Sequence, residues 1–141
     1  MIKRIPYQLA ANIMLVQLSA VLVFHALVIA GIIPFGIVWG GRLHNTREML
    51  QFESVSFATN VVLMLVIVLK RGNRWPFVSR KLLNAILWLF VVLFSLNTVG
   101  NLLAKATLET IVFTPLTFIS AIFCARLALP PNSAAKPPEQ P

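Results

Sequence analysis

The sequence predicts an all-α integral membrane protein, a bundle of four transmembrane helices with both termini in the cytoplasm. Of its 141 residues, 58% are hydrophobic and only 11% are charged, whereas about a quarter of the residues in a soluble domain are charged. The apolar residues are gathered into four segments long enough to cross a bilayer. Lysine and arginine are concentrated in alternate connections between these segments, which fixes the orientation.

The first span is expected over residues 9–33. Lys3 and Arg4 precede an apolar run that is too long for the apolar region of a signal peptide, and no small-residue cleavage motif follows it. The run therefore indicates an uncleaved transmembrane helix. Pro34 stands at its end, where the helix either kinks or stops, and Gly40-Gly41 interrupts it in either case.

The second span is expected over residues 50–69, in a helix that begins near Thr46. Asn45 is suited to accept hydrogen bonds from the first backbone N–H groups, and Glu48 follows at the spacing of a capping box. The fully apolar stretch begins only near Val55. Because about 20 residues are needed to cross the hydrocarbon, Glu53 must lie inside the membrane.

The third span is expected over residues 82–103. Its apolar run ends at Leu96 and is too short to cross alone. The helix must therefore continue through Asn97, Gly100 and Asn101, which places two amide side chains in the membrane.

The fourth span is expected over residues 108–129 and ends at Pro130-Pro131. Pro115 should kink it and free a carbonyl near Ile111. Small residues recur at intervals of three and four, a pattern typical of a close helix-packing seam: Thr107, Thr110, Thr114, Thr117, Ala121 and Cys124. Residues 1–130 form one four-span domain, and the composition of residues 131–141 predicts a disordered cytoplasmic tail.

The orientation follows from the 12 Lys and Arg residues. Nine lie in the N-terminal segment, the 70–81 connection and the C-terminal end, and three lie in the other two connections. The nine belong on the cytoplasmic side, where Arg126 is expected to extend to the membrane surface and Trp75, like Trp39 opposite, to join an interfacial belt of aromatic residues. The net charge of +8 thus indicates contact with anionic lipid and no nucleic-acid partner. We expect the bacterial inner membrane.

Ionisable and amide side chains inside the membrane are the candidates for function, because they are costly there. Glu53, Ser56 and Asn60 share one helix face, and Asn97 and Asn101 share another. With the expected topology, these groups lie in the outer half of the membrane. The candidate ligand-binding residues are Glu53, Asn60, Asn97, Asn101, His25, Glu109 and Arg42.

Two interpretations of this group are open. In one, it forms a polar pocket open to the outside, in which Glu53 binds a cation or exchanges a proton. In the other, the polar groups satisfy one another across helices and fix the helix register, which suits each asparagine alone. For Glu53 the pattern favours function, since a neutral residue would set register more cheaply. His25 is of interest only if it reaches Glu53, and Glu109 is expected to be solvated or paired with Lys105.

The leading hypothesis is a protein that binds or transports a small ligand or ion, as a homo-oligomer because four helices are few for a transporter. The alternative is a structural or regulatory subunit of a larger membrane complex. A lipid-modifying enzyme ranks last, because only His25 with Glu53 offers a general acid–base pair. One cysteine and two distant histidines do not make a metal site, and we expect no cofactor.

Overall fold

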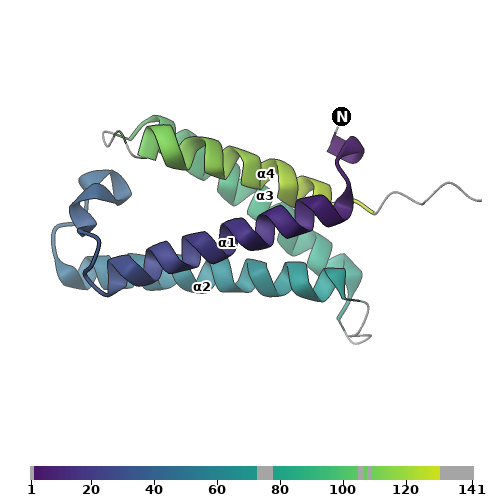
Figure 1. The fold of residues 1–141 in the computed structure, drawn as a ribbon, viewed down its shortest axis with the longest axis horizontal. Coiled ribbons are helices and arrows are strands. Elements are labelled where there is room, and N and C mark those ends of the chain that lie inside the picture. The colour runs from purple at the N-terminus through teal and green to yellow at the C-terminus, as the bar shows by residue number, and fades with distance from the viewer. Residues whose placement is uncertain (1, 73–77, 105–106, 108, 131–141) are drawn as a thin grey trace, which may run out of the picture.

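The chain folds into four long helices arranged as two helical hairpins (Figure 1). The computed structural model describes residues 2–72, 78–104, 107 and 109–130. Its long helices are α1 (Tyr7–Ile29), α2 (Thr46–Arg71), α3 (Arg80–Leu102) and α4 (Thr114–Ala128). A π-helical turn, η4 (Glu109–Phe113), leads into α4. Three short 3-10 turns are η1 (Ile2–Arg4), η2 (Phe35–Ile37) and η3 (Trp39–Gly41). The predicted all-α bundle is confirmed.

The surface of the bundle is apolar over the length of the helices. Four helical stretches, the last of them Thr110–Ala128, are long and apolar enough to cross a bilayer. Large apolar side chains point outwards from them, among them Val16, 72% exposed, and Ile111, 67% exposed. A surface of this kind is unfavourable in water and favourable against lipid. The protein is therefore a small polytopic membrane protein in contact with the bilayer.

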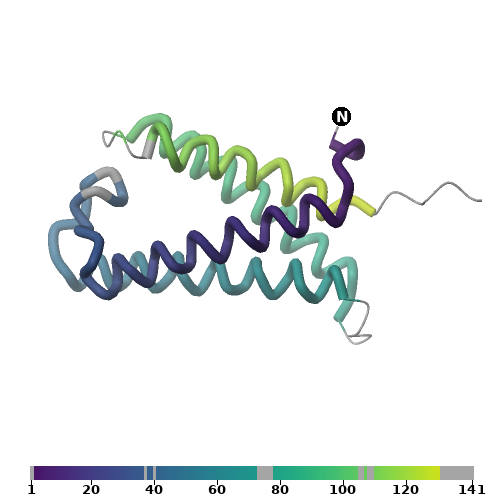
Figure 2. Tube along the Cα trace, viewed as in Figure 1, coloured from purple at the N-terminus to yellow at the C-terminus, as the bar shows by residue number. Residues whose placement is uncertain are grey.

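All four helices contribute to one buried core at one end of the molecule. We call this the terminal end, because α1 and α3 begin there and α2 and α4 end there; the opposite end, with residues 30–45, is the loop end. The main buried core brings together all four helices in the terminal half: Ala10, Ala11, Met14, Leu18, Leu63, Val66, Ile67, Leu83, Leu87, Phe90, Cys124, Leu127 and Ala128. Towards the loop end the two hairpins diverge (Figure 2).

A second, smaller core cluster lies at the loop end. It consists of Val28, Val38, Leu43 and Met49, which join α1, the connecting loop and α2. No residue of α3 or α4 belongs to it. The loop therefore packs on α1 and α2, the helices that it connects, and its core cluster does not extend to the second hairpin.

The start of α2 follows the sequence prediction. Asn45 accepts a hydrogen bond from the backbone N–H of Glu48 at 2.9 Å. The Glu48 carboxylate in turn accepts from the backbone N–H of His44 at 3.0 Å, one residue before the position of an ideal capping box.

The end of α1 differs from the prediction. The helix stops at Ile29, four residues before the expected end at residue 33. Gly31 adopts a φ of 74°, a conformation that glycine accepts without steric cost. The backbone N–H groups of Ile32 and Ile33 then turn back to the Leu27 carbonyl at 3.0 and 3.2 Å. The apolar composition concealed this glycine stop signal.

The helix changes type next to Pro115, where the sequence predicts a kink. Pro115 lies in the first turn of α4, directly after the π-helical turn η4. Because proline has no N–H to donate to the preceding turn, the hydrogen-bond pattern of the helix is interrupted at this point. The π-helical turn directly before Pro115 is a local adjustment of the kind that lets a membrane helix contain a proline.

The predicted small-residue seam of α4 packs against α3. Thr117 hydrogen-bonds the Thr98 hydroxyl at 2.9 Å, and the Thr110 hydroxyl donates to the Asn101 carbonyl at 3.2 Å. Further along the stripe, Ala121 and Cys124 are buried. The hydroxyl groups therefore serve helix packing, as the spacing predicts.

Arg126 does not extend to the surface as expected. It is completely buried, and its Nε donates to the Ile5 carbonyl at 2.6 Å. Its guanidinium lies 5.6 Å from the centre of the Tyr7 ring. Arg126 therefore fastens the N-terminal segment to α4. The other predictions for this end, Trp75 in the aromatic belt and the tail over 131–141, lie outside the described residues.

Replacing Arg126 should destabilise the bundle more than replacing an exposed cation beside it. We expect Arg126→Met to lower the free energy of unfolding by about 1–3 kcal/mol, because the Ile5 carbonyl loses a buried donor. Lys81→Met is the control, since Lys81 is exposed. Denaturation in mixed micelles measures both variants, and equal losses would contradict the role of Arg126.

The basic residues at the terminal end predict that this end faces the cytoplasm. Lys3→Cys and His44→Cys place a thiol at the terminal and the loop end respectively, while the native Cys124 is buried. In intact cells, a membrane-impermeant maleimide should label the cysteine at position 44 at once and that at position 3 only after permeabilisation. The reverse pattern would overturn the proposed orientation.

Candidate functional site

A buried carboxylate joins three elements near the loop end. Glu53 lies two turns into α2 and is only 1% exposed. Its Oε2 lies 2.5 Å from Nδ1 of His25 on α1, and its Oε1 accepts a hydrogen bond from the Trp39 indole at 2.8 Å. The contact that the sequence left open, between His25 and Glu53, is therefore made.

Hydrogen bonding explains how Glu53 tolerates burial. An acidic group in the middle of a membrane costs roughly 2.5–3.5 kcal/mol on insertion scales. A hydrogen bond to a charged group contributes about 1.5–3 kcal/mol, and Glu53 accepts from two donors on separate elements. The two bonds are together large enough to offset the cost, so loss of either donor would leave the carboxylate poorly satisfied.

Trp39 reaches Glu53 from a strained turn. Its φ of 56° lies in the left-handed region, which costs an ordinary residue about 1–2 kcal/mol. The hydrogen bond to Glu53 and a contact with the Phe52 ring, 5.0 Å between ring centres, hold it there. Sequence reasoning assigned Trp39 only to the aromatic belt, and its role as a donor to Glu53 was missed.

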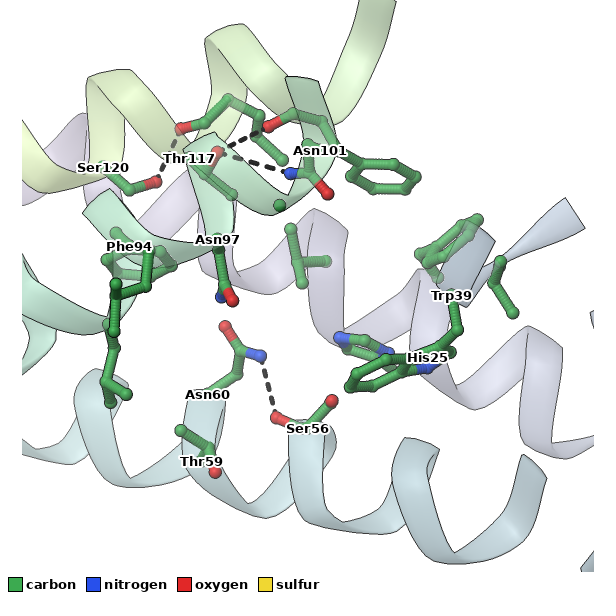
Figure 3. Close-up of a pocket in the computed structure, with 18 of the residues that line it drawn as sticks. His25, Trp39, Ser56, Thr59, Asn60, Phe94, Asn97, Asn101, Thr117 and Ser120 are labelled. Carbon is green, nitrogen blue, oxygen red and sulfur yellow. Dashed lines mark hydrogen bonds between the residues drawn. The ribbon is translucent and has the colours of Figure 1, made fainter. Parts of the chain in front are cut away.

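A cavity of about 500 Å³ lies between the two hairpins beside this carboxylate (Figure 3). All four helices and the loop that carries Trp39 contribute to its wall. The polar lining residues are Gln17, His25, Trp39, Arg42, Glu53, Ser56, Thr59, Asn60, Asn97, Asn101, Thr117 and Ser120. The apolar lining residues include Leu18, Val21, Phe24, Phe90, Leu93, Phe94, Leu96, Phe113 and Leu116.

Both predicted helix faces line the cavity. Asn60 on α2 and Asn97 on α3 point towards each other across it, while His25 and Trp39 lie close together at one end (Figure 3). The Asn60 amide donates to the Ser56 carbonyl within its own helix at 2.8 Å. Among the described residues, no hydrogen bond links Asn60 to Asn97. Mutual satisfaction of these two amides therefore does not account for them.

Asn101 behaves differently from the other two asparagines. Its amide approaches the Thr117 hydroxyl on α4 at 3.5 Å, and its backbone carbonyl accepts from Thr110. Asn101 thus contributes both to the cavity wall and to the packing of α3 on α4, which is the role that the register interpretation gave it.

The charged candidates at the loop end are only partly brought together. Arg42, one of the candidate residues, lines the cavity. Arg47 and His44, two basic residues close to it in the sequence, are exposed and do not line the cavity. The backbone of Glu109 belongs to η4, but its side chain and the whole of Lys105 lie outside the described parts of the chain.

Sequence reasoning missed the far end of the cavity. Gln17, in the middle of α1, donates to the hydroxyl of Ser120 on α4 and approaches the Leu116 carbonyl at 3.4 Å. A glutamine within an apolar helix was the available signal, by the same argument that identified Asn60. A serine in an apolar helix gives no comparable signal, because its hydroxyl can bond a carbonyl of its own helix. Ser120 does this at 2.8 Å.

The arrangement defines what the cavity can do chemically. Amide and hydroxyl groups can hydrogen-bond polar atoms, while phenylalanine and leucine side chains can hold an apolar body. The His25–Glu53 pair can share or exchange a proton. No three His, Cys, Asp or Glu side chains in the described residues form a group that could hold a metal ion.

Removing the acceptor at Glu53 should release the loop. In a protein whose only tryptophan is Trp39, made by Trp75→Phe and Trp88→Phe, we expect Glu53→Ala to increase the quenching of tryptophan fluorescence by acrylamide. The indole would then have lost the hydrogen bond that holds it against α2. Gln51→Ala, at an exposed position of the same helix, is the matched control. Equal quenching in all three proteins would show that Glu53 does not hold Trp39.

The chain matches no protein-family model, no curated protein and no solved structure. The function is therefore inferred from the residues and geometry of this site.

Proposed function

We propose that the protein binds a small molecule in the cavity between its two hairpins, within the membrane. The observation that carries the proposal is the buried Glu53 carboxylate, held by His25 and Trp39 on the wall of a cavity of about 500 Å³. A structural carboxylate has no need of an adjoining cavity, and a packing defect would not be lined by so many polar side chains.

The size and lining of the cavity fit a ligand site. Sites for small molecules have volumes of about 300–1,000 Å³, with mostly apolar walls and a few placed polar groups. Here aromatic side chains such as Phe24 and Phe94 alternate with the amides of Asn60, Asn97 and Asn101. The walls thus offer contacts to both the apolar and the polar parts of one molecule.

The carboxylate acts through His25. Both oxygens of Glu53 already have hydrogen-bond partners, so direct capture of a cation would have to displace one of them. The bond at Nδ1 orients the imidazole, and the His25 side chain, 14% exposed, lines the cavity. His25 is therefore the group of this pair that the ligand meets, and Glu53 is its positioning residue.

The expected topology places the cavity in the outer half of the bilayer. With the terminal end in the cytoplasm, the part of the cavity that Arg42 lines is directed towards the opposite side of the membrane. A protein of this size would carry a ligand across as a homo-oligomer, whereas a receptor or a subunit of a larger complex needs binding alone. We place the protein in the bacterial inner membrane.

The contact of 2.5 Å between His25 and Glu53 also supports a second candidate function, a lipid-modifying enzyme. A carboxylate that orients an imidazole is a common general-base arrangement. Such an enzyme would convert a lipid during incubation with the pure protein, whereas a binding protein would return the lipid unchanged.

Filling the cavity should weaken binding. The uncharged dye Nile red is a suitable probe, and energy transfer from Trp39, as the only tryptophan, reports dye near the site. Gly100 lines the cavity, and no neighbouring atom lies within 4 Å of where a side chain would begin. We expect Gly100→Phe to weaken the transfer-detected affinity about tenfold, equivalent to about 1.4 kcal/mol.

The matched control is Val99→Phe, one residue away on the same helix, at an exposed position that does not line the cavity. It should bind the dye as the parent protein does. If both variants bind equally well, or if the parent protein shows no saturable transfer, the cavity is not a ligand site and the larger-complex alternative takes its place.

A further inference from the structure

The two long sides of the cavity are closed to different degrees. On the side of α1 and α4, the rings of Phe24 and Phe113 pack at 5.4 Å between centres, and Gln17 hydrogen-bonds Ser120. On the side of α2 and α3, neither a hydrogen bond nor a ring contact bridges the two helices beside the cavity in the described residues. Only the side of α1 and α4 is therefore closed by side-chain contacts between helices.

Side chains on the side of α2 and α3 belong both to the cavity and to the outer surface. Val55 on α2 and Leu96 on α3 line the cavity, yet they are 66% and 63% exposed. Neither side chain is covered by a neighbouring helix. Exposure of this extent at the cavity wall is what an opening between α2 and α3, towards the hydrocarbon of the bilayer, would produce.

Two amides stand at this gap. Asn60 lies near the middle of α2 and faces Asn97 across the cavity (Figure 3). One N–H of the Asn60 amide is used within its own helix, which leaves the second N–H as a donor and the oxygen as an acceptor, and Asn97 likewise offers donors and an acceptor. Such groups are costly in hydrocarbon unless a polar partner satisfies them.

The chemistry of that partner follows from what the gap offers. A hydroxyl group donates one hydrogen bond and accepts others, which matches two facing amides that each offer a donor and an acceptor. An ammonium group could not use the Asn97 donor, and the Glu53 charge is already bonded to His25 and Trp39. A carboxylate accepts hydrogen bonds but donates none, so it could not bond the amide oxygens. It would also bring a negative charge into the bilayer.

We propose that the cavity opens sideways between α2 and α3 and takes the hydroxyl-bearing head of an uncharged lipid directly from the bilayer. Asn60 and Asn97 hydrogen-bond the hydroxyl, and the aromatic walls hold the adjoining part of the chain. This inference rests on the proposed binding function and specifies its ligand class and its route of entry.

The test uses nitroxide-labelled amphiphiles of equal chain length in lipid nanodiscs. Three probes differ only in the head group: a long-chain alcohol, the corresponding carboxylic acid and the corresponding trimethylammonium compound. Quenching of Trp39, as the only tryptophan, reports the nitroxide near the cavity. The alcohol should quench at the lowest mole fraction of the three, and Asn60→Leu/Asn97→Leu should require about threefold to tenfold more of it.

Two controls keep the result interpretable. Asn84→Leu also removes an asparagine from α3, but Asn84 does not line the cavity and its oxygen is buried without a partner among the described residues, so this variant should quench as the parent does. The single variant Asn97→Leu, whose side chain is exposed, gives the same comparison should the double variant fold poorly.

The outcomes separate the two proposals. Saturable Nile red transfer with no preference for the alcohol, or with no effect of Asn60→Leu/Asn97→Leu, overturns the hydroxyl-lipid inference while the binding site stands. Preference for the acid would assign the head-group contact to Arg42 and overturn the inference equally. Failure of every probe together with Nile red would remove the proposed function itself.

Discussion

The hydrogen bonds of the Glu53 carboxylate are the interaction on which the loop end of this protein depends. A buried acid requires donors, and the donors come from α1 through His25 and from the connecting loop through Trp39. These bonds fasten the loop to its own hairpin, and they position an imidazole beside the space between the hairpins. Without them, neither the strained backbone of Trp39 nor the orientation of His25 has an evident cause.

The shared core and the cavity lie in different halves of the molecule. The terminal half holds the core shared by all four helices and the cations that bond backbone carbonyls at the end of α4: Lys70 donates to Leu127, and Arg126 donates to Pro130 at 3.3 Å. Positive groups at a helix C-terminus also interact favourably with the helix dipole. Because this half holds the hairpins together, the other half tolerates a cavity and polar groups that a uniformly packed bundle would exclude.

The fold could be predicted from the sequence because the membrane imposes strong rules. Span length drew Glu53 into the helix, and periodicity placed Asn60 with Glu53 on one face and Asn97 with Asn101 on another; all four line the cavity. What escaped prediction depends on irregular backbone and on contacts between distant segments. The end of α1 at Ile29 depends on one glycine. The contact between Trp39 and Glu53 depends on the path of an irregular loop, which no sequence periodicity encodes. Gln17, in contrast, could have been predicted. It is an amide side chain in an apolar span, and the cost of such groups in the membrane is the criterion that identified Asn60.

The central claim is that the cavity holds a molecule, and native mass spectrometry of the protein released from membranes tests it most directly. The account predicts that the wild-type protein carries a bound small molecule which is absent from Gly100→Phe and retained by Val99→Phe. Accurate mass and fragmentation of the released molecule would then show whether it is an uncharged lipid with a hydroxyl group. A wild-type protein that is released bare, or one that carries the same adduct as Gly100→Phe, would contradict the account.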